Sequence, residues 1–163
     1  MAEPTPFRLS QLFSQLIGRK VVFTQTTAAL ESKIRQMYGI YTVPPHEVAI
    51  VVKADLPLLG SLAGVLVGLP DSAVKDHLRA NPVEELLRDA IYEVFNIASA
   101  AIFTEGRVVF TKMVSDPTCI DGNSEKALKK PDRRNYFNVT VDGYQGGKFT
   151  ILSQSLPVRV VNP

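Results

Sequence analysis

The chain has 163 residues, which suits one domain of ordinary size and excludes two full catalytic domains. Its composition, 45% hydrophobic and 21% charged, is typical of a globular protein and excludes wholesale disorder. Eighteen Lys and Arg against sixteen Asp and Glu leave a net charge of +2, too small for the broad positive field of a dedicated nucleic-acid-binding protein.

Cysteine content and hydropathy bear on where the protein works. Cys119 is the single cysteine, so the chain cannot form an internal disulfide, which is typical of a reducing compartment. Residues 1–8 lack the basic start and apolar run of a secretory signal. The longest apolar run, residues 56–69, is shorter than the ~20 residues that cross a bilayer. We therefore expect a cytoplasmic protein with no membrane span.

The first elements along the chain are predicted to be a helix and a strand. Apolar residues recur at helical spacing over residues 10–17, with Ser10 as the expected N-cap and Gly18 as the stop. Residues 20–26 are rich in β-branched and aromatic types, which favours a strand.

A hairpin is expected next. Residues 34–43 and 47–54 both read as strands, and they flank Pro44-Pro45-His46, a turn stiffened by proline.

Residues 55–69 fit either a buried strand or a buried helix, because nearly every position is apolar. Asp55 is a good N-cap, and Pro57 suits the first turn of a helix. Glycine recurs at every fourth position, which would line one helical face with backbone, at Gly60, Gly64 and Gly68. We therefore predict a tightly packed helix.

Two further helices are expected after Pro70. Asp71 is predicted to cap a short one. The longer one spans residues 81–103, with Asn81 as the cap, Pro82 at the first helical position and Glu84 completing a capping box. Its apolar stripe has a period of 3.6 residues and consists of Val83, Leu86, Leu87, Ala90, Ile91, Val94, Ala98, Ala101 and Ile102.

The C-terminal part of the chain reads as strands around a polar loop. A strand at residues 108–114 precedes a loop at about 115–135, which we expect to be mobile. Residues 136–141 and 148–152 alternate in polarity and flank a glycine-rich turn, as in an antiparallel hairpin. The whole chain is thus predicted to be one α+β domain, with long helices packed against a mainly antiparallel sheet.

Common catalytic motifs are absent from the sequence, including G-x-S-x-G, H-E-x-x-H and G-x-G-x-x-G. Neither His46 nor His77 has a cysteine or carboxylate at ligand spacing, so we expect no metal site. Chemistry must be sought elsewhere.

The exposed side of the long helix offers one candidate. At about 100° per residue, Asp89, Glu93 and Asn96 fall within a wedge of roughly 60°, opposite the apolar stripe. Carboxylates at i and i+4 repel slightly, so Asp89 with Glu93 is not the choice that helix stability alone would make. Charged residues on a solvated helix face are nevertheless common, and spacing alone leaves that interpretation open.

The segment Asp89-Ala-Ile-Tyr-Glu93-Val-Phe-Asn96 resembles the D/S-x-x-x-E-x-x-N signature of the CheC, CheX and FliY family of bacterial chemotaxis phosphatases, where the signature also lies on a long helix. The predicted order of elements is similar to that family over about residues 7–152. The glycine-rich turn at residues 143–147 also looks like a turn of some relatives. The resemblance implies a CheC-like fold and a single copy of the motif, as in CheX.

The resemblance also implies a function. Asn96 would enter the active site of a phosphorylated, CheY-like receiver domain and hold a water in line with its aspartyl phosphate, and its amide can both donate and accept hydrogen bonds. Glu93 would pair with the receiver's phosphate-site lysine, and Asp89 would be an outer docking contact. The protein would need no cofactor of its own, because Mg²⁺ is carried by the partner.

Three residues depart from the family pattern or extend it. Phe95 stands where a small residue is common, while Ala100 and Phe103 continue the exposed stripe with apolar groups. Bulk there would block entry into a receiver cleft. Alternatively, Ala100 and Phe103 would form an apolar contact with the partner or with a second subunit as a homodimer.

Two questions stay open at this level. Residues 125–135 carry Lys126, Lys129, Lys130, Arg133 and Arg134, and such a run is either solvated or attracts an acidic partner. The leading hypothesis is a receiver-binding phosphatase, and the alternative is a non-catalytic interaction module of the same fold.

Overall fold

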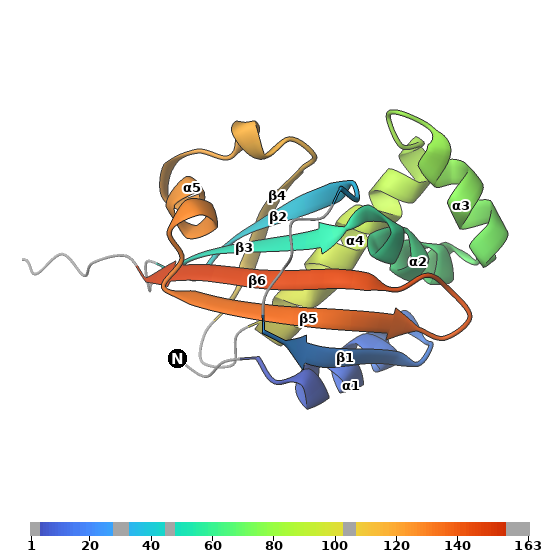
Figure 1. The fold of residues 1–163 in the computed structure, drawn as a ribbon, viewed down its shortest axis with the longest axis horizontal. Helices are drawn as coiled ribbons and strands as arrows, with labels where there is room; N and C mark the ends of the chain where they lie inside the picture. Colours follow the sequence, from blue (N-terminus) through green and yellow to red (C-terminus); the bar gives the residue numbers. More distant parts are fainter. Residues whose placement is uncertain (1–3, 28–32, 45–47, 103–106, 156–163) are drawn as a thin grey trace, which may run out of the picture.

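The computed structural model describes residues 4–27, 33–44, 48–102 and 107–155 and has an α+β fold (Figure 1). The helices are α1 (Pro6–Ile17), α2 (Leu56–Val67), α3 (Asp71–Arg79), α4 (Glu85–Ile102) and α5 (Gly122–Lys129), with a 3-10 turn, η1, at Pro117–Cys119. The strands are β1 (Val21–Thr26), β2 (Gln36–Thr42), β3 (Val48–Asp55), β4 (Val109–Val114), β5 (Arg133–Val141) and β6 (Gly147–Ser155). The predicted fold class is confirmed.

The strands form one antiparallel sheet in the order β1-β5-β6-β3-β2-β4. Both predicted hairpins are present, β2 with β3 and β5 with β6. The sheet also joins distant segments: β1 pairs with β5, with Val21 opposite Val141, and β3 pairs with β6, with Val51 opposite Leu152. β1 and β4 are left at the two edges.

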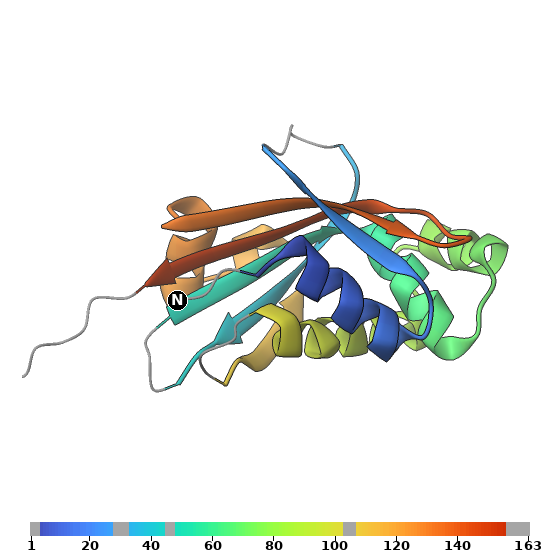
Figure 2. The same cartoon turned by 90° about the horizontal axis from the view of Figure 1, so that it is seen from below.

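The two faces of the sheet have different covers. Helices α1, α2 and α4 bury the main core on one face, and Figure 2 shows α1 and α4 side by side there. Because side chains alternate along a strand, β2 directs Met37 and Tyr41 into this core, while Tyr38 and Ile40 point to the other face. On that outer face Ile120, which directly follows η1, and helix α5 cover a smaller apolar cluster.

Helix α1 begins earlier than predicted. Its N-cap is Thr5, whose hydroxyl accepts from the Arg8 N–H at 3.2 Å, so the prediction of Ser10 as the cap is wrong. Ser10 instead donates its hydroxyl to the Pro6 carbonyl and accepts from the Phe23 N–H at 2.8 Å, which ties α1 to β1. The helix ends as expected at Gly18, which adopts φ 86°.

Helix α2 confirms the helical interpretation of the apolar segment. A Cβ added at Gly60 would lie 2.8 Å from Leu78 Cδ1, and one at Gly64 would lie 2.3 Å from Val74 Cγ2, so two of the glycines admit α3 to close contact. The Asp55 carboxylate does not cap α2; it accepts from the Lys148 N–H at 2.8 Å. Asp71 lies in the first turn of α3 rather than at its cap position.

Helix α4 begins at Glu85, so the predicted start at Asn81 with a capping box is wrong. In a capping box the Glu84 carboxylate would accept from the backbone N–H of Asn81. Its carboxylate instead lies 2.6 Å from His77 Nδ1 at the end of α3, and its carbonyl accepts from the Arg88 N–H. None of the described helices is long and apolar enough to cross a membrane.

The segment expected to be a loop at about 115–135 contains η1, α5 and the first residues of β5, so the prediction of loop structure throughout is wrong. Two apolar residues explain why this segment is folded: Ile120 and Ala127 are buried against the outer face of β2 and β3. Helix α5 lies at the opposite end of the sheet from α3 (Figure 1).

Candidate functional site

Helix α4 is held firmly against the main core. It packs on α2, α1 and β4, and its buried residues are Leu87, Ala90, Ile91, Val94, Phe95, Ala98, Ala101 and Ile102. The Tyr41 hydroxyl on β2 donates to the Phe95 carbonyl at 2.6 Å. Burial raises the pKa of the Tyr41 phenol well above its usual value, so the hydroxyl keeps its proton and remains a donor. The exposed side of α4 therefore stands on a fixed base.

Phe95 faces the core, not solvent. It is fully buried, its ring stacks on Phe110 with centroids 5.9 Å apart, and it fills the space over Gly39. The concern that its bulk would obstruct the exposed side of α4 is therefore wrong: at 3.6 residues per turn, Phe95 projects away from its neighbour Asn96.

Asp89, Glu93 and Asn96 are all exposed on one side of α4, as predicted. None of the three side chains forms a hydrogen bond or ion pair with another described residue. Glu93 and Asn96 are three residues apart, which places their Cβ atoms about 5–6 Å from each other. The Ser99 hydroxyl donates to the backbone carbonyl of Asn96 at 2.6 Å and not to the Asn96 carboxamide. An acid and an amide thus project together into solvent.

The apolar surroundings of these residues differ from the prediction. Ala100 is exposed beside them, whereas Phe103 lies outside the described residues. Leu86, assigned to the buried stripe, is 55% exposed, and Tyr92 is 46% exposed with its ring 4.7 Å from Phe110. Leu86 lies at the edge of the apolar stripe. At about 100° per residue it falls within about 20° of Glu93 around the helix axis, so its exposure could have been inferred from the sequence. We call Leu86, Asp89, Tyr92, Glu93, Asn96 and Ala100 the α4 face.

His77 is the one histidine among the described residues. His46 lies outside the described residues, and His77 pairs with Glu84, a carboxylate brought close by the fold and not by helical spacing. Within the described ranges, no three His, Cys, Asp or Glu side chains gather as metal ligands would.

No protein-family profile and no curated protein matches the sequence. Solved structures do match the fold. A chain of the FliM–SpeE complex from H. pylori aligns with a TM-score of 0.62 at 8% identity, over 90% of this chain and 80% of that one. FliY from Thermotoga maritima aligns with a TM-score of 0.56 at 14% identity, over 88% of this chain and 80% of that one. The FliM middle domain from H. pylori aligns with a TM-score of 0.54 at 11% identity, over 90% of this chain and 83% of that one. The chain therefore has the fold that FliY and the FliM middle domain share.

Proposed function

We propose that the protein binds the phosphorylated receiver domain of a response regulator through the α4 face and hydrolyses its aspartyl phosphate. Water adds to phosphorus, the bond between phosphorus and the aspartyl oxygen breaks, and inorganic phosphate leaves with the free carboxylate restored. Phosphoryl transfer of this kind depends on positioning and charge neutralisation more than on covalent chemistry. A single amide and a single carboxylate therefore suffice as the protein's contribution.

The observation that carries the proposal is the pair Glu93 and Asn96, whose side chains contact no hydrogen-bond or ion-pair partner among the described residues, on a well-anchored helix. The Asn96 carboxamide has a free acceptor and two donors, so it can hold a water and orient its lone pair toward phosphorus. Glu93 supplies a charge for the receiver's phosphate-site lysine, and Asp89 adds a second acid one turn away. Because Tyr41 and Phe95 fix α4, little conformational freedom is lost on docking.

The metal requirement follows from the same chemistry. Mg²⁺ would be bound by the receiver, whose acidic site holds the phosphate, and the α4 face would meet an already metal-bound centre. The protein itself would supply no ligand.

A non-catalytic interaction module is the second candidate. Leu86 and Tyr92 are about half exposed on the α4 face, and apolar side chains beside polar ones are typical of a binding surface. The similarity in fold to the FliM middle domain favours neither candidate over the other. On this alternative, receivers would bind to α4 without loss of phosphate.

Phosphate release tests both candidates. Purified receiver domains from the same genome are phosphorylated with acetyl phosphate, desalted, and followed with and without the protein in Mg²⁺ buffer. We expect release to be accelerated by the protein and the acceleration to fall about 100-fold with Asn96→Ala, because the water would no longer be held in line. Gln15→Ala is the matched control, because it removes an exposed helical amide on α1.

The acidic position has its own pair of variants. Glu93→Ala should weaken binding and turnover, whereas Glu85→Ala, an exposed acid at the start of the same helix, should leave both within about twofold. Binding of a receiver without any acceleration would establish the interaction module instead. Equal rates for wild type and Asn96→Ala would contradict the assignment of Asn96.

A further inference from the structure

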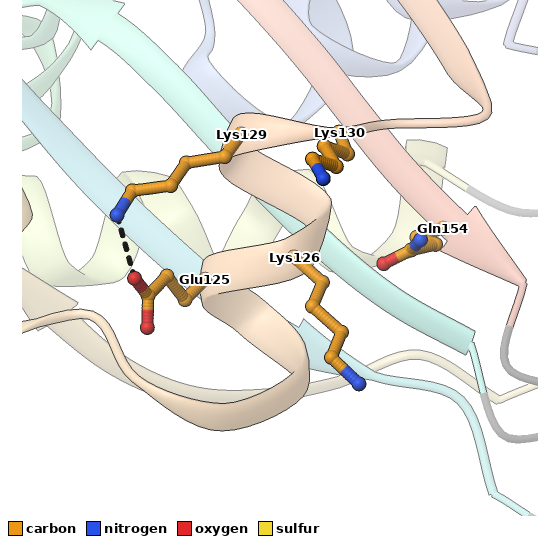
Figure 3. Close-up of a pocket in the computed structure, with 5 residues that line it drawn as sticks. All are labelled: Glu125, Lys126, Lys129, Lys130 and Gln154. Atoms are coloured by element: carbon orange, nitrogen blue, oxygen red, sulfur yellow. Dashed lines mark hydrogen bonds and ion pairs between the residues drawn. The ribbon is translucent and has the colours of Figure 1, made fainter.

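The outer face of the sheet carries a second candidate site, on the other side from the α4 face. Helix α5 and the end of β6 border an open hollow of about 250 Å³, lined by Glu125, Lys126, Lys129, Lys130 and Gln154. Figure 3 shows Lys129 reaching back to Glu125, while Lys126 extends on the other side of the helix and Gln154 points from β6 toward it. We call this hollow the α5 pocket.

The α5 pocket has more lysines than its ion pairs with described residues neutralise. Lys129 is neutralised by Glu125 at 2.6 Å. Lys126 and Lys130 are exposed and form no ion pair with a described residue. Lys126 lies in the last turn of α5 and Lys130 caps its C-terminal end, four residues later, a spacing at which like charges repel.

The acids of the same segment offset this charge only in part, because three lysines line the pocket against one glutamate. Glu125 is engaged by Lys129, and the Asp132 carboxylate accepts from the Ser155 N–H at 2.9 Å. Arg134 is exposed on β5 and, by strand alternation, faces the side of the sheet on which α5 lies. The pocket and its border therefore favour an anionic ligand.

Gln154 favours a ligand that has a hydrogen-bond donor as well as negative charge. Its Oε1 is buried and accepts no hydrogen bond from a described residue. A buried acceptor without a donor costs stability, and a ligand that brings an N–H would remove this cost. A carboxylate-bearing peptide has such a donor in its backbone. A nucleic-acid phosphodiester has none.

The pocket is held in place by packing. Ala127, between Lys126 and Leu128, is fully buried on β3, and Ile120 anchors the preceding turn. Helix α5 contacts both β3 and β6, so the lysines and Gln154 keep their relative positions. A ligand there would bind a pre-formed site and lose little free energy to ordering the protein.

We propose that the α5 pocket binds an acidic peptide segment of a partner protein. Carboxylates of the segment pair with Lys126 and Lys130, and a backbone N–H donates to Gln154 Oε1. Because α5 and α4 cover opposite faces of the sheet, this segment and a receiver on the α4 face can be bound at the same time.

Fluorescence anisotropy of labelled acetyl-(Glu)6-amide, with the full chain at 50 mM and 300 mM NaCl, tests this proposal. We expect saturable, salt-sensitive binding that weakens about 10-fold in Lys126→Ala/Lys130→Ala. The control Lys20→Ala/Lys33→Ala removes the same charge from exposed positions elsewhere and should change affinity less than twofold. Gln154→Ala should weaken binding about fivefold, since it removes one acceptor and no charge.

Three results would overturn the proposal. Equal weakening by the two double variants would mean that net charge alone drives binding. Unchanged binding by Gln154→Ala would show that no peptide N–H donates to Gln154 Oε1. Binding of heptathymidylate, which carries a similar charge, as tightly as the glutamate peptide would reject a peptide ligand. Circular dichroism of each variant verifies that it is folded, and phosphate release by Lys126→Ala/Lys130→Ala should equal that of wild type whatever the outcome for the α4 face.

Discussion

Gly39→Ala tests what fixes the position of α4. A Cβ at residue 39 would lie 2.5 Å from Phe95 Cδ1, 3.0 Å from Phe95 Cε1 and 3.0 Å from Tyr41 Cε2. Carbon atoms pack best at about 3.5–4.0 Å, so the Phe95 ring must move by roughly 1 Å or rotate off its rotamer. Overpacking of this kind costs about 1–3 kcal/mol of unfolding free energy. Because Phe95 precedes Asn96, the shift should also impair the α4 face.

A double-mutant cycle in urea isolates the contact. Phe95→Leu alone should destabilise the protein, because it removes buried ring atoms. In the Gly39→Ala background the smaller side chain relieves the overlap, so the double variant should be more stable than the sum of the single effects by at least ~1 kcal/mol. A neutral Gly39→Ala, within about 0.5 kcal/mol, or strictly additive effects would refute the claim that this contact fixes α4.

Other contacts predict separate changes in stability. Tyr41→Phe should cost about 1 kcal/mol at pH 7. Burial raises the phenol pKa in the folded state, so the wild type should lose stability as pH rises above about 10, and the variant should lose less. Asp55→Ala should cost about 1–3 kcal/mol, because the Lys148 N–H loses its buried acceptor. Gly64→Ala should cost about 1–3 kcal/mol by forcing Val74 and α3 off α2. Urea unfolding measures all three, and changes under about 0.5 kcal/mol would contradict the corresponding contacts.

The candidate site was accessible from the sequence because it depends on one long, regular helix. A period of 3.6 residues places Asp89, Glu93 and Asn96 opposite the buried stripe whatever the rest of the fold does. The same rule misplaced Leu86, which lies at the boundary of the stripe, where burial depends on what packs alongside. The start of α4 was mispredicted because Glu84 has a tertiary partner, His77, that competes with the local capping box.

Features that depend on distant contacts were not predictable. The pairing of β1 with β5 joins segments more than a hundred residues apart, and local patterns carry no information about it. Helix α5 was missed because its segment is mostly polar and the buried residues Ile120 and Ala127 are too few to give a periodic signal. The α5 pocket was therefore visible only as a run of cations, without Gln154, which comes from another strand.

The distance from Asn96 to the phosphoryl position of a bound receiver decides whether Asn96 can place a water for attack on phosphorus. It can be measured in a crystal structure of the protein with a receiver activated by beryllofluoride and Mg²⁺, which stand in for the aspartyl phosphate and its metal. One hydrogen bond of about 2.8 Å from Asn96 to the water, and an in-line approach of about 3–3.5 Å from that water to beryllium, predict about 6 Å or less between the Asn96 carboxamide and beryllium, with Glu93 against the receiver's lysine. A complex in which α4 faces solvent, or in which Asn96 lies beyond about 10 Å, would contradict the account.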